Sequence, residues 1–242
     1  MDTSATAQGG ILPDSAAPDE RLVLAPPPAP GSAAQSDDDR VFHVTRALKD
    51  TPRWKLAQSD ADLDPAHVVR DFSCAAGFEI DLARAPHLAR VLERIRHAVG
   101  HRTSDVKKYW HRTRPFVGTN LPICTAHSDG LDNSYAYPSG HTTWGWLTAS
   151  ILASALPDRA TQIMQRGRIF GESRIVCGVH WKSDVQAGYM NGSAIFAALQ
   201  EQPTFTEQMA KVRQELLALR DAKTAPDAKT CAVEQQAAQD AF

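Results

Sequence analysis

The chain has 242 residues, of which 43% are hydrophobic and 22% charged, so it can bury one sizeable hydrophobic core. Its 26 basic and 28 acidic residues leave a formal net charge of -2, which gives no overall attraction for nucleic acid or for an anionic membrane. We therefore expect a single domain and exclude a protein that works by binding a polyanion.

The two ends of the chain differ in composition from its middle. Residues 1–38 are rich in Ala, Pro, Ser, Gly and Asp and include a proline run at 26–30, which predicts an extended or disordered arm. Leu22, Val23 and Leu24 offer a short apolar anchor by which this arm could still lie along the domain surface. Residues 39–222 carry apolar residues at helical spacing and are predicted to form the folded domain. Residues 223–242 predict a loose tail, in which Cys231 is the one residue that could be fixed to the rest.

The middle region shows apolar residues three and four positions apart and almost no alternating pattern, which predicts an all-α fold. Asp64 followed by Pro65 is a typical helix start, with the aspartate as N-cap. The clearest amphipathic stripe runs from Leu88 to Val99, with arginines largely on the opposite face. Further helices are predicted over residues 140–156, 158–172, 182–199 and 204–222.

The longest uncharged stretch runs from Asn133 to Pro157. Its apolar part starts only at Thr142 and is shorter than the roughly 20 residues that a membrane-spanning helix needs. We therefore predict a buried core helix there. The N-terminal residues lack the charged and apolar regions of a signal peptide, so we expect that any export signal has already been removed.

The four cysteines lack the close pairs that mark zinc sites and thioredoxin-like motifs. Two disulfides and four buried thiols both fit this count, and an even count mildly favours an oxidising compartment. Cys74 and Cys124 both lie beside loop segments, so we favour a disulfide between them. This choice leaves Cys177 and Cys231 for a second one.

The acidic turn formed by Asp60, Asp62 and Asp64 resembles the start of a calcium loop. A calcium loop needs glycine at its sixth position and glutamate at its twelfth, where this chain has Pro65 and Asp71. We interpret the turn as solvated and helix-capping. We expect the chain to need no metal and no cofactor.

Three short clusters contain the residue types that anion chemistry requires. They are Lys107 with Arg114-Pro115, Tyr137-Pro138-Ser139-Gly140-His141, and Ser173-Arg174 with His180 and Asp184. Lys107, Arg114 and Arg174 could supply positive charge around the oxygens of a phosphate group, and arginine adds paired hydrogen bonds. Pro115 is expected to end a helix just after Arg114, which would fix where that side chain emerges.

The second cluster precedes the predicted uncharged helix. Backbone N–H groups in the first turn of that helix have no intrahelical partner and point toward an anion, and Gly140 lets the backbone approach it closely. His141 could then protonate a leaving alkoxide. Tyr135 and Tyr137, just before the cluster, could contact the organic part of a substrate.

In the third cluster, His180 and Asp184 are four residues apart, which places them on one helical face if the helix begins that early. A carboxylate in that position can keep one ring nitrogen of the histidine protonated. The other nitrogen is then free to attack phosphorus and to form a covalent intermediate.

Together the clusters resemble the signature of the type 2 phosphatidic acid phosphatase superfamily, which is Lys-x6-Arg-Pro, Pro-Ser-Gly-His and Ser-Arg-x5-His-x3-Asp. Every position of that signature is matched. The flanking segments at 72–77, 171–174 and 180–184 are similar to the soluble branch, the bacterial class A non-specific acid phosphatases. The likeness extends from about the proline-rich arm to about residue 220.

The resemblance implies an all-helical acid phosphatase that hydrolyses small phosphate monoesters, such as nucleotides and aryl or sugar phosphates, and that is periplasmic or secreted. It implies that His180 is the nucleophile, that Asp184 orients it, and that His141 is the proton donor. It assigns five residues to the phosphate: Lys107, Arg114, Ser139, Gly140 and Arg174. Since His141 must be protonated while His180 stays neutral, their pKa values must be pushed apart, which predicts a bell-shaped pH profile.

Other activities fit the same residues. In the related vanadium-dependent haloperoxidases, a similar pattern holds vanadate and the reaction is an oxidation. A phosphotransferase would pass the phosphoryl group of the phosphohistidine to an alcohol. A non-catalytic phosphate-binding or structural helical domain would form no phosphohistidine and release no alcohol. The sequence predicts no nucleic-acid partner and no membrane insertion, and it leaves a homo-oligomer open.

Overall fold

The computed structural model describes residues 11–240 and 242, and every regular element among them is a helix. The α-helices of this part are α1 (Glu20–Val23), α2 (Ala33–Thr45), α3 (Pro52–Ser59), α4 (Pro65–Arg70), α5 (Ser73–Ala76), α6 (Pro86–Trp110), α7 (Asp129–Asp132), α8 (Gly140–Ala155), α9 (Ala160–Val176), α10 (Lys182–Gln200), α11 (Pro203–Asp221) and α12 (Ala228–Ala237). Short 3-10 turns lie at Arg46–Leu48, Leu82–Arg84 and Pro157–Arg159. The predicted all-α fold is confirmed.

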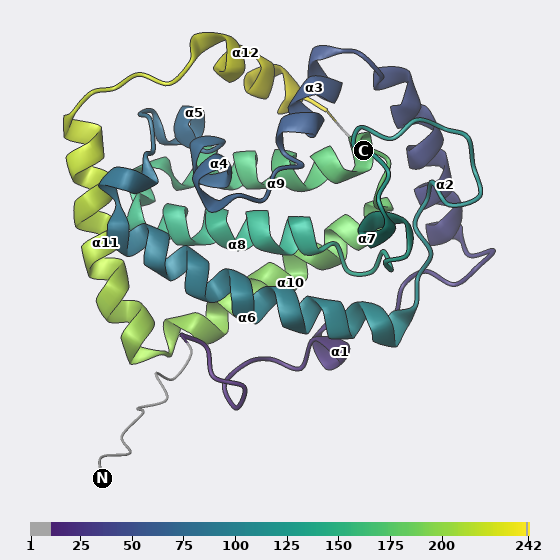
Figure 1. Cartoon of the computed structure of the whole chain (residues 1–242), viewed down its shortest axis with the longest axis horizontal. Coiled ribbons are helices and arrows are strands. Elements are labelled where there is room, and N and C mark those ends of the chain that lie inside the picture. The colour runs from purple at the N-terminus through teal and green to yellow at the C-terminus, as the bar shows by residue number, and fades with distance from the viewer. Residues whose placement is uncertain (1–10, 241) are drawn as a thin grey trace.

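Helix α8 forms the centre of the molecule, between α9 and α10, with α6 packed in front of it (Figure 1). It contains no Asp, Glu, Lys or Arg, and most of its side chains are buried. A helix that is apolar on all sides must be enclosed by others. The predicted buried core helix is therefore confirmed, and its start at Gly140 is as expected.

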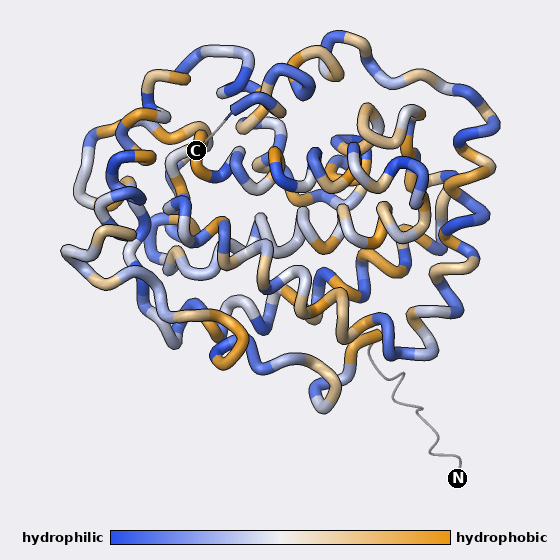
Figure 2. Tube along the Cα trace, turned by 180° about the vertical axis from the view of Figure 1, so that it is seen from behind, coloured by the Kyte–Doolittle hydropathy of each residue, from blue (hydrophilic) through white to orange (hydrophobic). Residues whose placement is uncertain are grey.

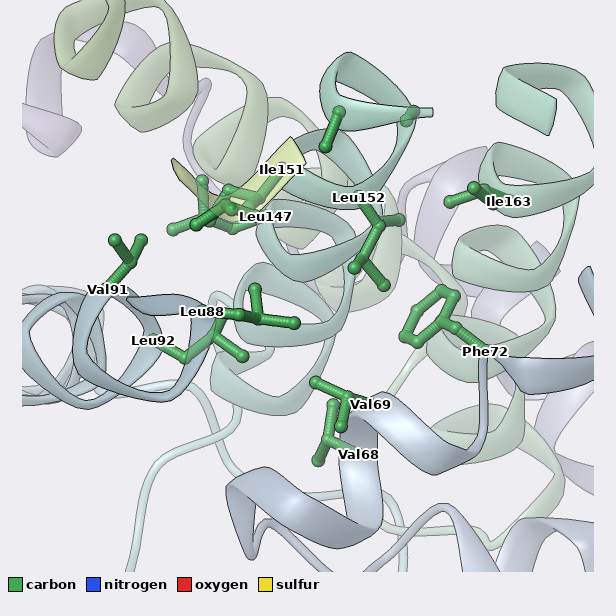
Figure 3. Close-up of a cluster of buried hydrophobic side chains, with 14 of the residues drawn as sticks. Val68, Val69, Phe72, Leu88, Val91, Leu92, Leu147, Ile151, Leu152 and Ile163 are labelled. Atoms are coloured by element: carbon green, nitrogen blue, oxygen red, sulfur yellow. The ribbon is translucent and has the colours of Figure 1, made fainter. Parts of the chain in front are cut away.

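The main core joins α6 and α8 to α4 and α9 (Figure 3). Leu88 and Leu92 of the amphipathic stripe face Leu147 and Ile151 of α8, and all four are fully buried. Phe72 closes the core beside α9. The outer helix α11 alternates hydrophilic and hydrophobic residues along its length, as a helix with one buried face does (Figure 2).

The remaining predicted helices are found with small shifts at their ends. The helix predicted over 158–172 begins at Ala160 and continues to Val176, so Ser173 and Arg174 belong to its last turn. Asp64 caps α4 by accepting hydrogen bonds from the backbone N–H groups of Ala66 and His67. None of the helices in the described part of the chain is long and apolar enough to cross a membrane.

The described part of the N-terminal arm is folded, against the prediction that residues 1–38 are extended or disordered. Helix α2 begins inside the arm, and Ser32 caps it by accepting a hydrogen bond from Gln35 N. Leu24 and Asp38 are almost fully buried. The composition hid this because the arm packs through a few separated residues rather than through a periodic stripe. Residues 1–10 of the predicted arm lie outside the described part.

The C-terminal segment is also ordered, since residues 228–237 form α12 rather than a loose tail. Cys231 fixes this helix to Cys74, and Cys124 pairs with Cys177. The predicted disulfide between Cys74 and Cys124 is therefore wrong. Lying beside a loop says nothing about which cysteines meet, because a disulfide requires Cα atoms about 4.4–6.8 Å apart; the observed separations are 5.3 and 4.5 Å.

Replacing both Cys74 and Cys231 by serine is expected to lower the free energy of unfolding by about 2–5 kcal/mol, because the bridge spans 157 residues and restricts the unfolded chain. Activity should persist, since α12 packs on α3, α5 and α9, away from the start of α8. Urea unfolding followed by circular dichroism measures the effect. An unchanged midpoint in the double variant would contradict the role assigned to this bridge.

Candidate active site

The start of α8 is fixed against the start of α10. Ser139 is the N-cap of α8, is fully buried, and accepts a hydrogen bond from Thr142 N at 3.3 Å. Its own backbone N–H donates to the carbonyl oxygen of Asp184 at 3.0 Å. A Cβ atom at Gly188 would lie 2.6 Å from Thr142 Cβ and 2.9 Å from the Ser139 carbonyl oxygen, so only glycine allows α10 to approach this closely.

His180 lies two residues before the start of α10 and is 2% exposed. Its Nδ1 lies 3.3 Å from Asp184 Oδ2, and the same oxygen accepts a hydrogen bond from Trp181 N at 2.8 Å. The helix starts only at Lys182, so the two residues do not share a helical face as predicted. Asp184 instead sits in the first turn of α10 and reaches back across the helix start to the imidazole.

Arg114 lies against the other nitrogen of His180, with Nη1 3.1 Å from Nε2. Hydrogen bonds to the Val179 carbonyl oxygen and to Ser134 hold the guanidinium in place. The prediction that Pro115 ends the preceding helix is wrong, because α6 already ends at Trp110. Arg114 therefore projects from a loop, and its hydrogen bonds rather than a helix end fix its direction.

Arg174, in the last turn of α9, is 2% exposed. Its Nε and Nη1 atoms are buried, and neither finds an acceptor within the described part of the chain. Burial and the nearby Arg114 lower the pKa of Arg174 to about 10, which still leaves it charged at neutral pH. Buried donors without partners are costly and rare in folded proteins, so this guanidinium is prepared to receive an anion.

Lys107, which projects from α6, is the third cation of the group with Arg114 and Arg174. Its Nζ donates to the Tyr135 carbonyl oxygen at 3.0 Å. Burial, followed by the charges of Arg114 and Arg174, lowers the pKa of Lys107 to about 7. Lys107 therefore carries its charge below about pH 7 and loses it progressively above.

His141 lies in the first turn of α8, with Nε2 3.2 Å from the carbonyl oxygen of Ala61. A carbonyl oxygen can only accept, so Nε2 carries a hydrogen and Nδ1 is the nitrogen that can exchange a proton. Burial and the charge of Arg174 hold the pKa of His141 well below its usual range. Burial and Arg114 act in the same direction on His180.

We expected the protein to push the pKa values of His141 and His180 apart. The protein groups alone do not do so. Both values are lowered, and for the same reasons, burial and the surrounding cations. A phosphate dianion bound among Lys107, Arg114 and Arg174 would counter those cations and favour protonation of the nearby His141.

A cavity of about 640 Å³ opens beside these residues. Lys107, Gly140 and His141 contribute to its wall together with Leu63, Val99, Gly100 and Trp144. The face of α6 from Lys107 back to Arg96 lines it, a distance of about 16 Å at 1.5 Å per residue. His97 and His101, both exposed, also belong to this wall.

The two tyrosines differ in position. Tyr137 is 4% exposed, and its hydroxyl donates to the Ala25 carbonyl oxygen of the arm at 2.6 Å, so it does not lie at a substrate rim as predicted. Tyr135 is half-buried, and its ring packs edge-on against His111. Its carbonyl oxygen reaches Lys107, while contact of its ring with substrate stays a prediction.

Sequence reasoning missed Arg112 and Asp38. Arg112 donates to Asp184 Oδ1 at 2.7 Å and to Asp38 Oδ2 at 2.7 Å. Both residues are nearly fully buried. The one available signal was a second arginine two positions before Arg114, and nothing in the arm distinguishes Asp38 from the neighbouring Asp37 and Asp39.

Comparison with known proteins identifies the family. A model of the PAP2 superfamily matches residues 95–205. The acid phosphatase of Zymomonas mobilis is 49% identical over 220 residues, which cover 90% of this chain and 83% of that protein. The chain belongs to the PAP2 superfamily. The range matched by the PAP2 model contains every residue predicted to bind phosphate or to act in catalysis, from Lys107 to Asp184.

Other PAP2 relatives have the same activity in their names. Non-specific acid phosphatases from Salmonella typhimurium and Providencia stuartii are 40% and 35% identical, over 81% and 86% of this chain and 79% and 85% of theirs. The chain is accordingly a phosphatase of the PAP2 superfamily.

A solved structure has a similar fold, the transmembrane PAP2 type phosphatidylglycerolphosphate phosphatase from Bacillus subtilis. Its TM-score is 0.52 at 16% identity, and the match covers 78% of this chain and 91% of that one. At this identity the likeness concerns the arrangement of helices only.

Within residues 11–240 and 242, no group of three or more His, Cys, Asp or Glu side chains could hold a metal ion.

Proposed function

We propose that this PAP2 phosphatase hydrolyses phosphate monoesters through a phosphohistidine on His180. The observation that carries the proposal is the arrangement around that imidazole. Nδ1 lies beside the Asp184 carboxylate, while Nε2 lies against Arg114 in a buried group of cations. A neutral ring with its proton on Nδ1 would direct the lone pair of Nε2 to the place where a phosphate would bind.

In the first step, His180 Nε2 forms a bond to phosphorus and the ester P–O bond breaks. The proton on Nδ1 stays there, and Asp184 stabilises the positive charge that the ring acquires. His141 Nδ1 gives a proton to the departing alkoxide, which leaves as an alcohol. Arg114 and Arg174 hold the equatorial oxygens throughout, with the free N–H groups of Arg174 accommodating their charge.

In the second step, His141 Nδ1 takes a proton from water and the resulting hydroxide attacks phosphorus. The P–N bond to His180 breaks, phosphate leaves, and the neutral imidazole is restored. The same histidine thus acts first as an acid and then as a base, so no net proton remains on the enzyme. Lys107 and the N–H groups at the start of α8 complete the binding of the anion.

The organic part of the ester would lie in the cavity along α6. The volume of about 640 Å³ is within the range typical of small-molecule sites, so nucleotides and aryl or sugar phosphates fit by size. The two disulfides suit an oxidising compartment, which supports a periplasmic or secreted location.

A rapid-mixing experiment with p-nitrophenyl phosphate tests the phosphohistidine. We expect a burst of p-nitrophenol of about one equivalent per site, followed by slower turnover, provided that hydrolysis of the phosphoenzyme is the slower step. Quenching in alkali, which preserves phosphohistidine, should trap phosphate on a peptide that contains His180. Trapping of the phosphate on a residue other than His180 would contradict the mechanism.

Two further additions separate the alternative activities. Vanadate should inhibit phosphate release, whereas a haloperoxidase would gain bromide oxidation in its presence. Excess alcohol should divert part of the product into a new phosphate ester if the phosphohistidine can be intercepted. Turnover in the presence of a chelator should be unchanged, since no protein group here provides a metal site within the described residues.

A further inference from the structure

Asp38 of the N-terminal arm lies next to the start of α10. Its Oδ1 accepts a hydrogen bond from Ser183 N at 2.8 Å, and its Oδ2 accepts one from Ser183 Oγ at 2.6 Å. Ser183 belongs to the first turn of α10, where backbone N–H groups lack intrahelical partners. A buried carboxylate at this place stabilises both the free N–H and the helix dipole.

Arg112 joins Asp38 to the carboxylate behind the nucleophile. One amino group of its guanidinium, Nη2, donates to Asp38 Oδ2, and the other, Nη1, donates to Asp184 Oδ1, both at 2.7 Å. Nη1 also donates to Ser183 Oγ, and the ring of Trp181 stacks on the guanidinium, with its centroid 5.4 Å from Cζ. Asp184 then contacts His180 through its other oxygen.

We infer that Asp38 and Arg112 are positioning residues for the nucleophile: they hold the Asp184 carboxylate in place behind His180, so that a residue of the arm supports the catalytic site. The inference rests on the proposed role of His180. Asp38 also lies outside the range matched by the PAP2 model, so the helices within that range do not provide the whole support of the site.

The contacts of Asp38 and Arg112 do more than pack the side chains, because burial disfavours the ionised form of Asp184. Burial raises its pKa to about 6, while Arg112 is the largest influence that lowers it and Asp38 raises it. The other titratable groups that influence or contact Asp184 are Lys107, Arg114, Tyr137 and His180. Asp184 must be ionised to accept the Nδ1 hydrogen of His180, so activity is lost as pH falls through the pKa of this pair.

The sign of each charge gives two opposite expectations. Replacing Arg112 by glutamine removes a positive charge, raises the pKa of the pair, and should move the acid limb of the kcat/KM profile to higher pH. Replacing Asp38 by asparagine removes a negative charge, lowers that pKa, and should move the acid limb to lower pH. Damage to the fold would not shift the two limbs in opposite directions.

The experiment measures kcat/KM between about pH 4 and 8 for both variants, with p-nitrophenyl phosphate as substrate. Partners that orient a functional histidine from behind are worth about 10–100-fold in metal sites, and we expect a loss of that order in kcat for Arg112→Gln. Arg112→Lys keeps the positive charge but cannot form the same paired hydrogen bonds as the guanidinium. The acid limb of its kcat/KM profile should therefore lie where it does in the unaltered enzyme, while kcat should be only partly retained.

Asp37→Asn is the matched control. Asp37 precedes Asp38 on α2 and pairs with Lys182 at the same junction, but it is 40% exposed and does not touch Asp184. Its profile should match that of the unaltered enzyme. Acid limbs that stay in place in both Arg112→Gln and Asp38→Asn would overturn the inference. An active His180→Ala enzyme would instead overturn the proposed nucleophile, which keeps the two failures distinct.

Discussion

Replacing His180 by alanine is expected to reduce kcat by roughly 10⁴–10⁶-fold, because removal of an attacking nucleophile costs up to about 10⁶-fold in other covalent enzymes. The side chain lies between Arg114 and Asp184, and alanine removes the ring nitrogen that lies against Arg114. The burst of p-nitrophenol and the alkali-stable phosphoenzyme should disappear together. Rapid-mixing kinetics and phosphate trapping on the same preparation measure both.

Binding of phosphate should survive this substitution, since Lys107, Arg114 and Arg174 remain. Inhibition by inorganic phosphate therefore tests whether the variant still has an intact site. His127→Ala is the matched control: that histidine is largely exposed, pairs with Asp132, and should leave kcat unchanged. An inactive variant that still forms a phosphoenzyme would show that the nucleophile is another residue.

The residues of the site were accessible from the sequence because each cluster combines chemistry with a fixed local spacing. Ser139 and Gly140 lie at the start of α8 as the pattern of loop followed by apolar helix indicated. The carboxylate of Asp184 reaches His180 from four residues away, although by a different geometry from the one predicted. The local sequence pattern therefore predicted which residues are in contact, but not the geometry of the contact.

The missed features depend on contacts between distant segments. Asp60, interpreted as part of a solvated turn, is fully buried and paired with Arg166, 106 positions away. Arg112 joins Asp38 to Asp184 in the same way, across three separate segments. An isolated charge has the same local pattern whether it is exposed or paired, so no periodicity could distinguish these cases.

Composition was also a poor guide to structure at both ends of the chain. The arm and the tail lack apolar stripes, yet α2 is fixed by Asp38 and α12 by the Cys74–Cys231 bridge. Such segments are ordered by a few strong contacts with the rest of the domain. The apolar content of a segment indicates whether it can fold on its own. Neither of these two segments needs to fold on its own, so their low apolar content did not predict their structure.

Replacing Arg174 by methionine is expected to lower kcat/KM by about 10³-fold or more, because this guanidinium is prepared for the charge that develops on the transferring phosphoryl group. The same change is expected to raise the free energy of unfolding by about 1–3 kcal/mol, since it removes two buried donors that have no acceptor in the described structure. Steady-state kinetics and urea unfolding of one preparation measure both effects.

The two effects have one cause. The protein leaves the buried N–H donors of Arg174 without acceptors, so that the substrate can provide them. The buried guanidinium therefore destabilises the free protein and becomes favourable only when the anion binds. Arg168→Met on the same helix is the control, because Arg168 is 34% exposed and already paired with Glu172; it should change activity little and gain no stability. Loss of both activity and stability in Arg174→Met would mean that Arg174 supports the fold, and the phosphate would then have to be held mainly by Arg114 and Lys107.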